Sequence, residues 1–178
     1  MDETIRREMI ALLPRLRRFA YGLTGSVDEG DDLVQATCER AIRHIDTWQP
    51  GTRLDSWMYR IARNAYLNQI RARKVRGQHL QLADADLDRY ANVDGARAAE
   101  AHLTYGVVRE IVWRLPEEQR TVLLLVCVEG WAYKEVSEML GLPIGTVTSR
   151  LARARTALKA YMEGARRGEA EPEGSAQE

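Results

Sequence analysis

The stretch from Trp131 to Leu158 constrains the fold of this chain more than any other part of the sequence. It predicts two helices joined by a tight turn, because Gly141 permits the positive φ of a helix exit and Pro143 prevents the first helix from continuing. This layout is that of a helix-turn-helix. In the second helix the apolar residues recur at spacings of three and four, so they form one stripe made of Val147, Leu151, Ala154 and Leu158.

The opposite face of the second helix carries small or hydrogen-bonding side chains and one long cation. A narrow polar face of this kind suits the major groove, where a guanidinium can form two hydrogen bonds with guanine. Arg150 and Arg155 lie nearer the flanks, where contacts with phosphate are expected. An ordinary helical hairpin with a solvated basic face is the alternative interpretation. The residues of this face are Thr146, Ser149, Ala152, Arg153 and Thr156.

The composition favours an all-α protein that works in the cytoplasm. The chain has 178 residues, which suits one large domain or two small ones, and its few aromatic residues and many Arg, Ala and Leu residues favour helix. No apolar run reaches the ~20 residues that a membrane span needs, so we expect no membrane insertion. Arginines interrupt the first 18 residues, which argues against a signal peptide.

The charges divide the sequence into blocks, although 26 basic and 26 acidic residues balance overall. Residues 1–76 hold 14 basic and 10 acidic side chains, whereas residues 77–104 hold 2 and 5. We therefore expect two helical domains, residues 1–76 and 105–163, joined by a flexible acidic linker over 77–104 and followed by a disordered tail over 164–178. Such an arrangement concentrates positive charge locally without making the whole protein basic.

The first block predicts three helical segments. Residues 4–24 predict helix, with Pro14 starting a second segment after a short break. Ser26 caps a helix over 27–45, and Thr52 caps a long helix over 53–75, after a turn at Pro50-Gly51. The outward side of the middle helix is a ridge of mixed charge that fits either a solvated face or a protein-docking surface, and it holds Asp32, Gln35, Glu39 and Arg43.

The long helix is expected to present aromatic rings and cations together on its outer face. Unpaired bases stack on rings while the nucleic-acid backbone follows positive charge, so this face suits single-stranded DNA. The alternative is that the two tyrosines simply cover neighbouring elements. The residues concerned are Tyr59, Arg60, Arg63, Asn64, Tyr66 and Lys74.

In the second block, residues 96–115 predict a helix that Pro116 ends, and a further helix runs to about Val128. Cys38 and Cys127 are expected to be small buried hydrophobic residues, because each lies in a helical pattern far from the other. The three histidines show no metal-ligand spacing with each other or with the cysteines, and no glycine-rich phosphate loop occurs. We therefore expect no metal, no cofactor and no enzymatic activity.

Four segments resemble one family when they are taken in order. The chain is similar to the extracytoplasmic-function (ECF) sigma factors of the sigma-70 family, over residues 8–162. The two blocks then correspond to sigma regions 2 and 4, with regions 1 and 3 absent. The segments that carry the resemblance are Asp31-Asp32-Leu33-Val34-Gln35, Trp57-Met58-Tyr59-Arg60-Ile61-Ala62-Arg63-Asn64, Leu115-Pro116, and Pro143-Ile144-Gly145-Thr146-Val147-Thr148-Ser149-Arg150.

The resemblance implies three groups of functional residues. The residues from Trp48 to Asp55 match the loop that captures a base of the minus-ten element, and Asn64 matches a position that lines the base pocket. Thr148 stands where many members carry Arg or Lys, and Ala152 stands where several carry a bulky residue. The implied core polymerase contacts are Asp31, Asp32, Gln35, Glu39, Arg40 and Arg43; the minus-ten contacts are Trp48, Arg53, Tyr59, Arg63, Asn64 and Tyr66; the minus-thirty-five contacts are Thr146, Thr148, Ser149, Arg150, Ala152, Arg153 and Arg155.

The family also implies the partners and the kind of function. An ECF sigma factor binds the β′ clamp and β flap of core RNA polymerase, directs promoter-specific initiation, typically in a stress response, and is held by an anti-sigma factor. Two other interpretations remain open. One is a sigma-like decoy that binds an anti-sigma factor without touching DNA, and the other is a plain helix-turn-helix regulator. The decoy would tend to lose its basic reading helix, and the regulator leaves the first block unexplained.

Overall fold

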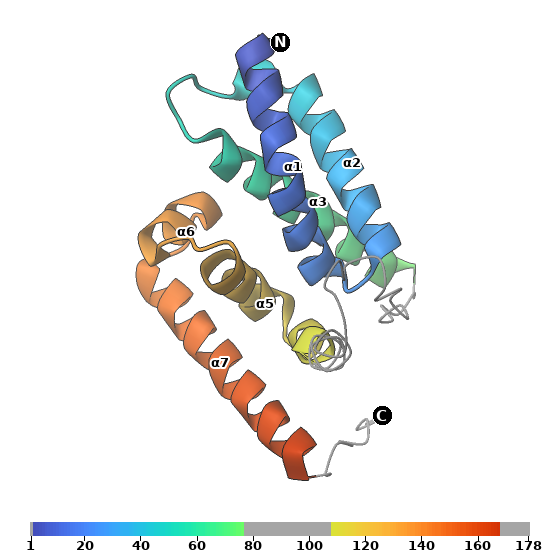
Figure 1. Cartoon of the computed structure of the whole chain (residues 1–178), viewed down its shortest axis with the longest axis vertical. Coiled ribbons are helices and arrows are strands. Elements are labelled where there is room, and N and C mark those ends of the chain that lie inside the picture. The colour runs from blue at the N-terminus through green and yellow to red at the C-terminus, as the bar shows by residue number, and fades with distance from the viewer. Residues whose placement is uncertain (1, 77–107, 168–178) are drawn as a thin grey trace, which may run out of the picture.

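The computed structural model describes residues 2–76 and 108–167, and every regular element in these ranges is a helix. The expected all-α fold class is therefore confirmed for the described part of the chain. The expected linker over 77–104 lies outside the described residues. No helix in the described ranges is long and apolar enough to cross a membrane. Figure 1 shows α1, α2 and α3 as one group of helices and α5, α6 and α7 as another.

The first half of the molecule is a bundle of three long helices. The side chain of Asp2 accepts a hydrogen bond from the Thr4 N–H at the start of the first helix, and Gly25 ends that helix with a φ of 71°. Ser26 caps the second helix as the sequence predicts, since its Oγ accepts from the Glu29 N–H at 3.4 Å. The elements are α1 (Glu3–Thr24), α2 (Val27–Arg43), the short 3-10 helix η1 (Ile45–Thr47) and α3 (Leu54–Val75).

Two local predictions for this half are wrong. The helix α1 runs through Pro14 without a break, because the apolar stripe on either side of the exposed proline packs on one line into the core. Thr52 does not cap α3: its hydroxyl donates to the Gln49 carbonyl at 2.7 Å. Arg53 occupies the cap position, and its side chain makes no capping hydrogen bond to the helix backbone. Gly51, with a φ of 89°, supplies the left-handed residue of the turn, as expected after proline.

The second half begins with helical residues 108–114 and continues with α5 (Glu117–Leu123), α6 (Tyr133–Leu140) and α7 (Ile144–Arg167). The predicted helix ending near Val128 is α-helical only to Leu123. Residues Leu124–Val128 then form a π-helical turn, in which the Glu129 N–H donates to the Leu124 carbonyl at 3.0 Å. On this turn Cys127 lies exposed, contrary to expectation, while Cys38 is half-buried.

The helix-turn-helix is formed by α6 and α7. Gly141 adopts a φ of 64°, and the Leu142 N–H donates to the Ser137 carbonyl, so the turn closes as the sequence predicts. Glu135 helps to cap the start of α6, because its side chain accepts a 2.8 Å hydrogen bond from the Ala132 N–H. The predicted apolar stripe of α7 is confirmed: Val147, Leu151 and Ala154 are buried and Leu158 is partly buried.

The two halves pack directly against each other. Gly22 of α1 faces the π-helical turn so closely that a Cβ at this position would lie 2.6 Å from Leu124 Cδ2. The C-terminal end of α1 is also held from the second half, since the Trp113 indole N–H donates to the Thr24 carbonyl at 3.0 Å and Arg109 donates to the Gly25 carbonyl. The second half therefore covers one side of α1 and one side of α3.

Candidate nucleic-acid interface

The outer face of α7 is open to solvent, as the sequence predicts. Thr148, Ser149, Ala152 and Arg153 are all exposed, and Thr146 is half-buried. The guanidinium of Arg153 lies back along the helix, where its Nε donates to the Ser149 carbonyl at 3.3 Å and its Nη2 contacts Ser149 Oγ at 3.4 Å. These contacts are exposed and local, so the arginine is free to exchange them for an outside acceptor.

The other two arginines of α7 differ from Arg153. Arg150 forms a 2.6 Å ion pair with Glu118 at the start of α5, and its side chain is only 16% exposed. It therefore joins α7 to α5 and is already paired. Arg155 lies exposed on the other flank, with its Nη2 3.7 Å from the sulfur of Cys127. Of these cations, Arg153 has the geometry best suited to reading a base.

The face of α3 that was expected to be exposed is in fact covered. Tyr59 and Tyr66 are each 1% exposed, so the prediction that their rings point to solvent is wrong. The physical reason is that α3 packs on α1 and α2 along one side and on the second half along the other. The interpretation that these rings cover neighbouring elements is the correct one for this arrangement. Asn64 remains exposed, whereas Arg63 is half-buried and lies 3.6 Å from Glu117.

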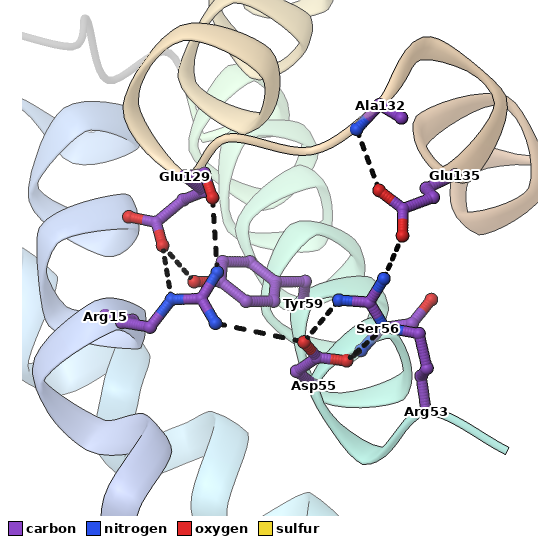
Figure 2. Close-up of polar contacts among 8 residues, drawn as sticks. All are labelled: Arg15, Arg53, Asp55, Ser56, Tyr59, Glu129, Ala132 and Glu135. Carbon is purple, nitrogen blue, oxygen red and sulfur yellow. Dashed lines mark hydrogen bonds and ion pairs between the residues drawn. The ribbon is translucent and has the colours of Figure 1, made fainter.

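The Tyr59 hydroxyl meets a fully buried carboxylate of the second half. It donates to Glu129 Oε2 at 2.6 Å, and Arg15 Nε contacts the same oxygen at 3.1 Å. Arg18 approaches the other carboxylate oxygen at 3.5 Å, and Arg15 also donates to the Glu129 backbone carbonyl. Figure 2 shows Arg15 and Tyr59 converging on Glu129. Burial, then the hydrogen bond to Glu129 and its charge, raise the pKa of Tyr59 far above its usual value.

The Tyr66 hydroxyl meets a buried cation in the same way. Arg120 Nη2 donates to it at 2.8 Å, and Arg120 Nη1 donates to the Trp113 carbonyl at 2.8 Å. Arg120 is 4% exposed, and this burial lowers the pKa of its guanidinium. Two tyrosines that lie two turns apart on α3 therefore each bond a charged group of the second half, one a carboxylate and one a guanidinium.

Arg53, at the start of α3, forms contacts with both halves of the molecule. Its guanidinium forms two hydrogen bonds to Asp55, at 3.1 and 2.8 Å, and an ion pair with Glu135 of α6. The same guanidinium lies 4.2 Å from the centre of the Trp131 ring. Beside it lies an open cavity of about 520 Å³, whose lining includes Trp48, Trp57 and Met139. The loop expected to capture a base therefore faces the second half across this cavity.

The outward ridge of α2 forms a second exposed surface. Asp32, Gln35, Glu39 and Arg43 are exposed as predicted, and Gln35 donates to Glu39 at 3.1 Å. Two further members of the expected polymerase-binding set are less accessible. Arg40 is half-buried, and Asp31 is half-buried because it accepts a 2.7 Å hydrogen bond from the Tyr21 hydroxyl and pairs with Arg17.

Comparison with known proteins identifies the two halves. The family model for Sigma-70 region 2 matches residues 9–76, and the model for Sigma-70 region 4 matches residues 106–158. The ECF RNA polymerase sigma factor EcfG of Rhodopseudomonas palustris is 35% identical over 167 residues, which cover 93% of this chain and 90% of the relative. The chain belongs to the ECF sigma factors of the sigma-70 family. The resemblance read from the sequence is thereby confirmed, and residues 9–76 and 106–158 are called region 2 and region 4 below.

Other relatives of this sigma factor agree. SigW of Bacillus subtilis is 29% identical, over 82% of this chain and 81% of its own length. Among solved structures, the sigma factor RpoE in complex with the anti-sigma factor NepR from Bartonella quintana matches with a TM-score of 0.72 and 26% identity, covering 91% of this chain and 98% of that one. These relatives are transcription regulators rather than enzymes.

The contacts that join region 2 to region 4 in this sigma factor include five charged residues and one tryptophan that sequence reasoning missed. They are spread over the whole chain and form no local motif. The one signal available was the alternative interpretation of the two tyrosines on α3, that they cover neighbouring elements, and region 4 is one of those elements. The missed residues are Arg15, Arg18, Arg120, Glu129, Trp131 and Glu135.

Proposed function

We propose that this chain binds core RNA polymerase and directs transcription initiation at its own set of promoters. The observation that carries the proposal is the pair of matches to regions 2 and 4, in that order, together with an exposed polar face on α7. A polymerase specificity subunit needs a docking surface, a head that reads duplex DNA and a head that traps single-stranded DNA. Such a protein acts with the polymerase, and hence in the cytoplasm.

Region 4 supplies the proposed reader of the minus-thirty-five element. Arg153 and Ser149 would contact base edges from the major groove, with Thr148 and Ala152 beside them. Thr146 and Arg155 would contact the flanking backbone. Arg150 stays in the proposed set, although its 2.6 Å pair with Glu118 makes a role in holding α7 on α5 the stronger expectation.

Region 2 supplies the proposed minus-ten reader. Trp48 and Arg53 lie on the loop and at the start of α3, and Arg63 and Asn64 lie midway along α3. Together they would hold an extruded base. Flipping a base costs a few kcal/mol of unstacking, and ring stacking returns about 1–3 kcal/mol per base. Tyr59 and Tyr66 belong to the proposed set only in a state where region 4 has left α3, since both rings are buried here.

The exposed ridge of α2 is the proposed docking surface for the polymerase β′ clamp, and region 4 is the proposed partner of the β flap. The charge-reversing substitution Asp32→Arg tests this assignment, since Asp32 is exposed and its replacement leaves the core intact. We expect Asp32→Arg to compete poorly for core polymerase in a binding assay, while Asp46→Arg, an exposed acid on η1, competes as well as wild type. Equal competition by both variants would remove α2 from the interface.

Regulation by an anti-sigma factor is the second part of the proposal. Its support is the match to a sigma factor that was solved with its anti-sigma factor bound, over nearly the whole of both chains. Capture of this chain from its native cell, followed by identification of the bound proteins, tests both parts together. We expect polymerase subunits and a small companion protein. Recovery of the companion without any polymerase subunit would favour a decoy.

A further inference from the structure

The guanidinium of Arg53 is occupied by two groups of region 4 that match what a DNA strand would offer. A flat ring, Trp131, lies 4.2 Å from it, and an anion, Glu135, forms an ion pair with it. Nucleic acid presents the same two features to an arginine, a base face for stacking and a phosphate for charge-assisted hydrogen bonds. The arginine therefore makes, within the chain, both kinds of contact that it would make with DNA.

Both groups are held in place, Trp131 by packing between the two regions and Glu135 by the start of α6. Trp131 is 4% exposed and packs edge-on against Tyr59, with ring centres 5.6 Å apart. Glu135 is anchored because its second oxygen accepts the Ala132 N–H at 2.8 Å, at the start of α6 (Figure 2). The ring and the carboxylate thus stand as a preorganised pair, which lowers the entropic cost of holding the arginine.

We propose that Trp131 and Glu135 form an internal mimic of single-stranded DNA that occupies Arg53 and shields the minus-ten loop until region 4 moves away. The proposal rests on the proposed function, in which Arg53 meets the minus-ten strand. The neighbouring contacts also favour the closed arrangement, since Glu129 accepts a hydrogen bond from Tyr59 and pairs with Arg15 beside the same loop. In the free protein, region 4 then covers the minus-ten loop, so DNA has to compete with region 4 for Arg53.

The ion pair between Arg53 and Glu135 can break readily. The Arg53 and Glu135 side chains are 51% and 37% exposed, so water and salt screen their ion pair and it contributes modestly to closure. A closed state of this kind lowers apparent DNA affinity by the fraction of molecules that are open. Weakening the mimic should raise that fraction and tighten binding, without any new contact between protein and DNA.

The test measures the affinity of the full chain for a fluorescent oligothymidylate of about 20 nucleotides by fluorescence anisotropy. Glu135→Gln removes the charge and keeps an oxygen that can accept the Ala132 N–H. We expect it to bind about three- to five-fold more tightly than wild type. Glu138→Gln is the matched control, because it removes an equal charge from the same helix at a residue paired with Lys134, and its affinity should stay at the wild-type value.

Two further variants make the result decisive. In an Arg53→Ala background the substitution Glu135→Gln should give no gain in oligonucleotide affinity, because the guanidinium that Glu135 and Trp131 contact is absent. Trp131→Phe keeps an aromatic ring in the packed position and shrinks the surface beneath the guanidinium, so it should give a smaller gain of its own. A Glu138→Gln gain equal to that of Glu135→Gln, a gain that persists without Arg53, or no gain in either mimic variant would overturn the proposal.

A parallel assay separates this proposal from the proposed function. With saturating core polymerase and genomic DNA, wild type and Glu135→Gln should give the same promoter-specific transcripts, because polymerase holds both proteins open. If wild type gives no such transcripts, the proposed function fails. If it gives them and the oligonucleotide affinities do not change, the mimic alone fails.

Discussion

The Tyr59 hydroxyl donates a 2.6 Å hydrogen bond to Glu129, which lies 70 positions further along the chain and in the other region. The carboxylate is fully buried and has Arg15 as its second close partner. A buried carboxylate is costly unless its hydrogen bonds are satisfied, so this contact both holds the two regions together and commits Tyr59 to the closed arrangement.

Replacing Tyr59 by phenylalanine should destabilise the protein. The ring is retained in its packing, edge-on to Phe19 with ring centres 5.0 Å apart, but the carboxylate of Glu129 loses a donor that water cannot replace. We expect the free energy of unfolding to fall by about 1–3 kcal/mol in a urea titration. The same change at Tyr161, half-buried on α7, should alter it by less than about 0.5 kcal/mol. Equal effects would show that the Tyr59 bond contributes nothing specific.

Asp55 should give the stability a distinct dependence on acid pH. Burial alone would raise its pKa, but hydrogen bonds from Arg53 and the Ser56 N–H, with the charges of Arg53 and Arg15, outweigh burial and lower the pKa. A lowered folded pKa stabilises the protein above the ordinary value of about 3.9, and this contribution is lost as pH falls through the folded value.

The substitution Asp55→Asn tests that dependence. It should lower the melting temperature at pH 7 and have a much smaller effect near pH 2, where wild type has lost the same contribution. Asp32→Asn, at an exposed carboxylate of α2, should change the melting temperature little at either pH. An Asp55→Asn penalty that is as large near pH 2 as at pH 7 would contradict the assigned cause.

The helix-turn-helix was predictable because its signals are local. Gly141 and Pro143 fix the turn, and the stripe ending in Leu158 follows from helical periodicity, so sequence and structure agree there. The covered face of α3 was not predictable in the same way. A helix that packs on two sides has no single apolar stripe, and tyrosine is compatible with solvent or with a buried polar partner. The partners of Tyr59 and Tyr66 come from distant positions and are charged, which a single sequence does not reveal.

Asn64 should act during strand opening rather than in duplex binding. It is exposed midway along α3, so Asn64→Ala leaves the packing intact. We expect it to reduce open-complex formation on a duplex promoter, and a promoter with a pre-melted bubble should recover part of the loss. Asn68→Ala, one turn later on the same exposed side, should behave as wild type. Equal loss on both templates would assign Asn64 to folding or docking instead.

Arg153 should read a base of the minus-thirty-five element. A good bidentate contact with a base is worth roughly 1–3 kcal/mol, so Arg153→Ala should reduce promoter-specific transcription by about ten-fold or more while core binding survives. Arg150→Ala is the control: it breaks the 2.6 Å pair with Glu118 and should lower stability or affinity uniformly. Transcription from promoters with each minus-thirty-five base changed separates the two, and unchanged base preferences in Arg153→Ala would show that this residue reads no base.

The most direct measurement of the proposed function maps the 5′ ends of transcripts that core polymerase makes on genomic DNA of the source organism, with and without this protein. A sigma factor with two reading heads predicts new start sites that depend on the protein and share two short sequence elements upstream, at a constant separation. The substitution Arg153→Ala should deplete these starts, and Asp32→Arg should abolish them at limiting polymerase. An identical set of start sites with and without the protein would contradict the assignment.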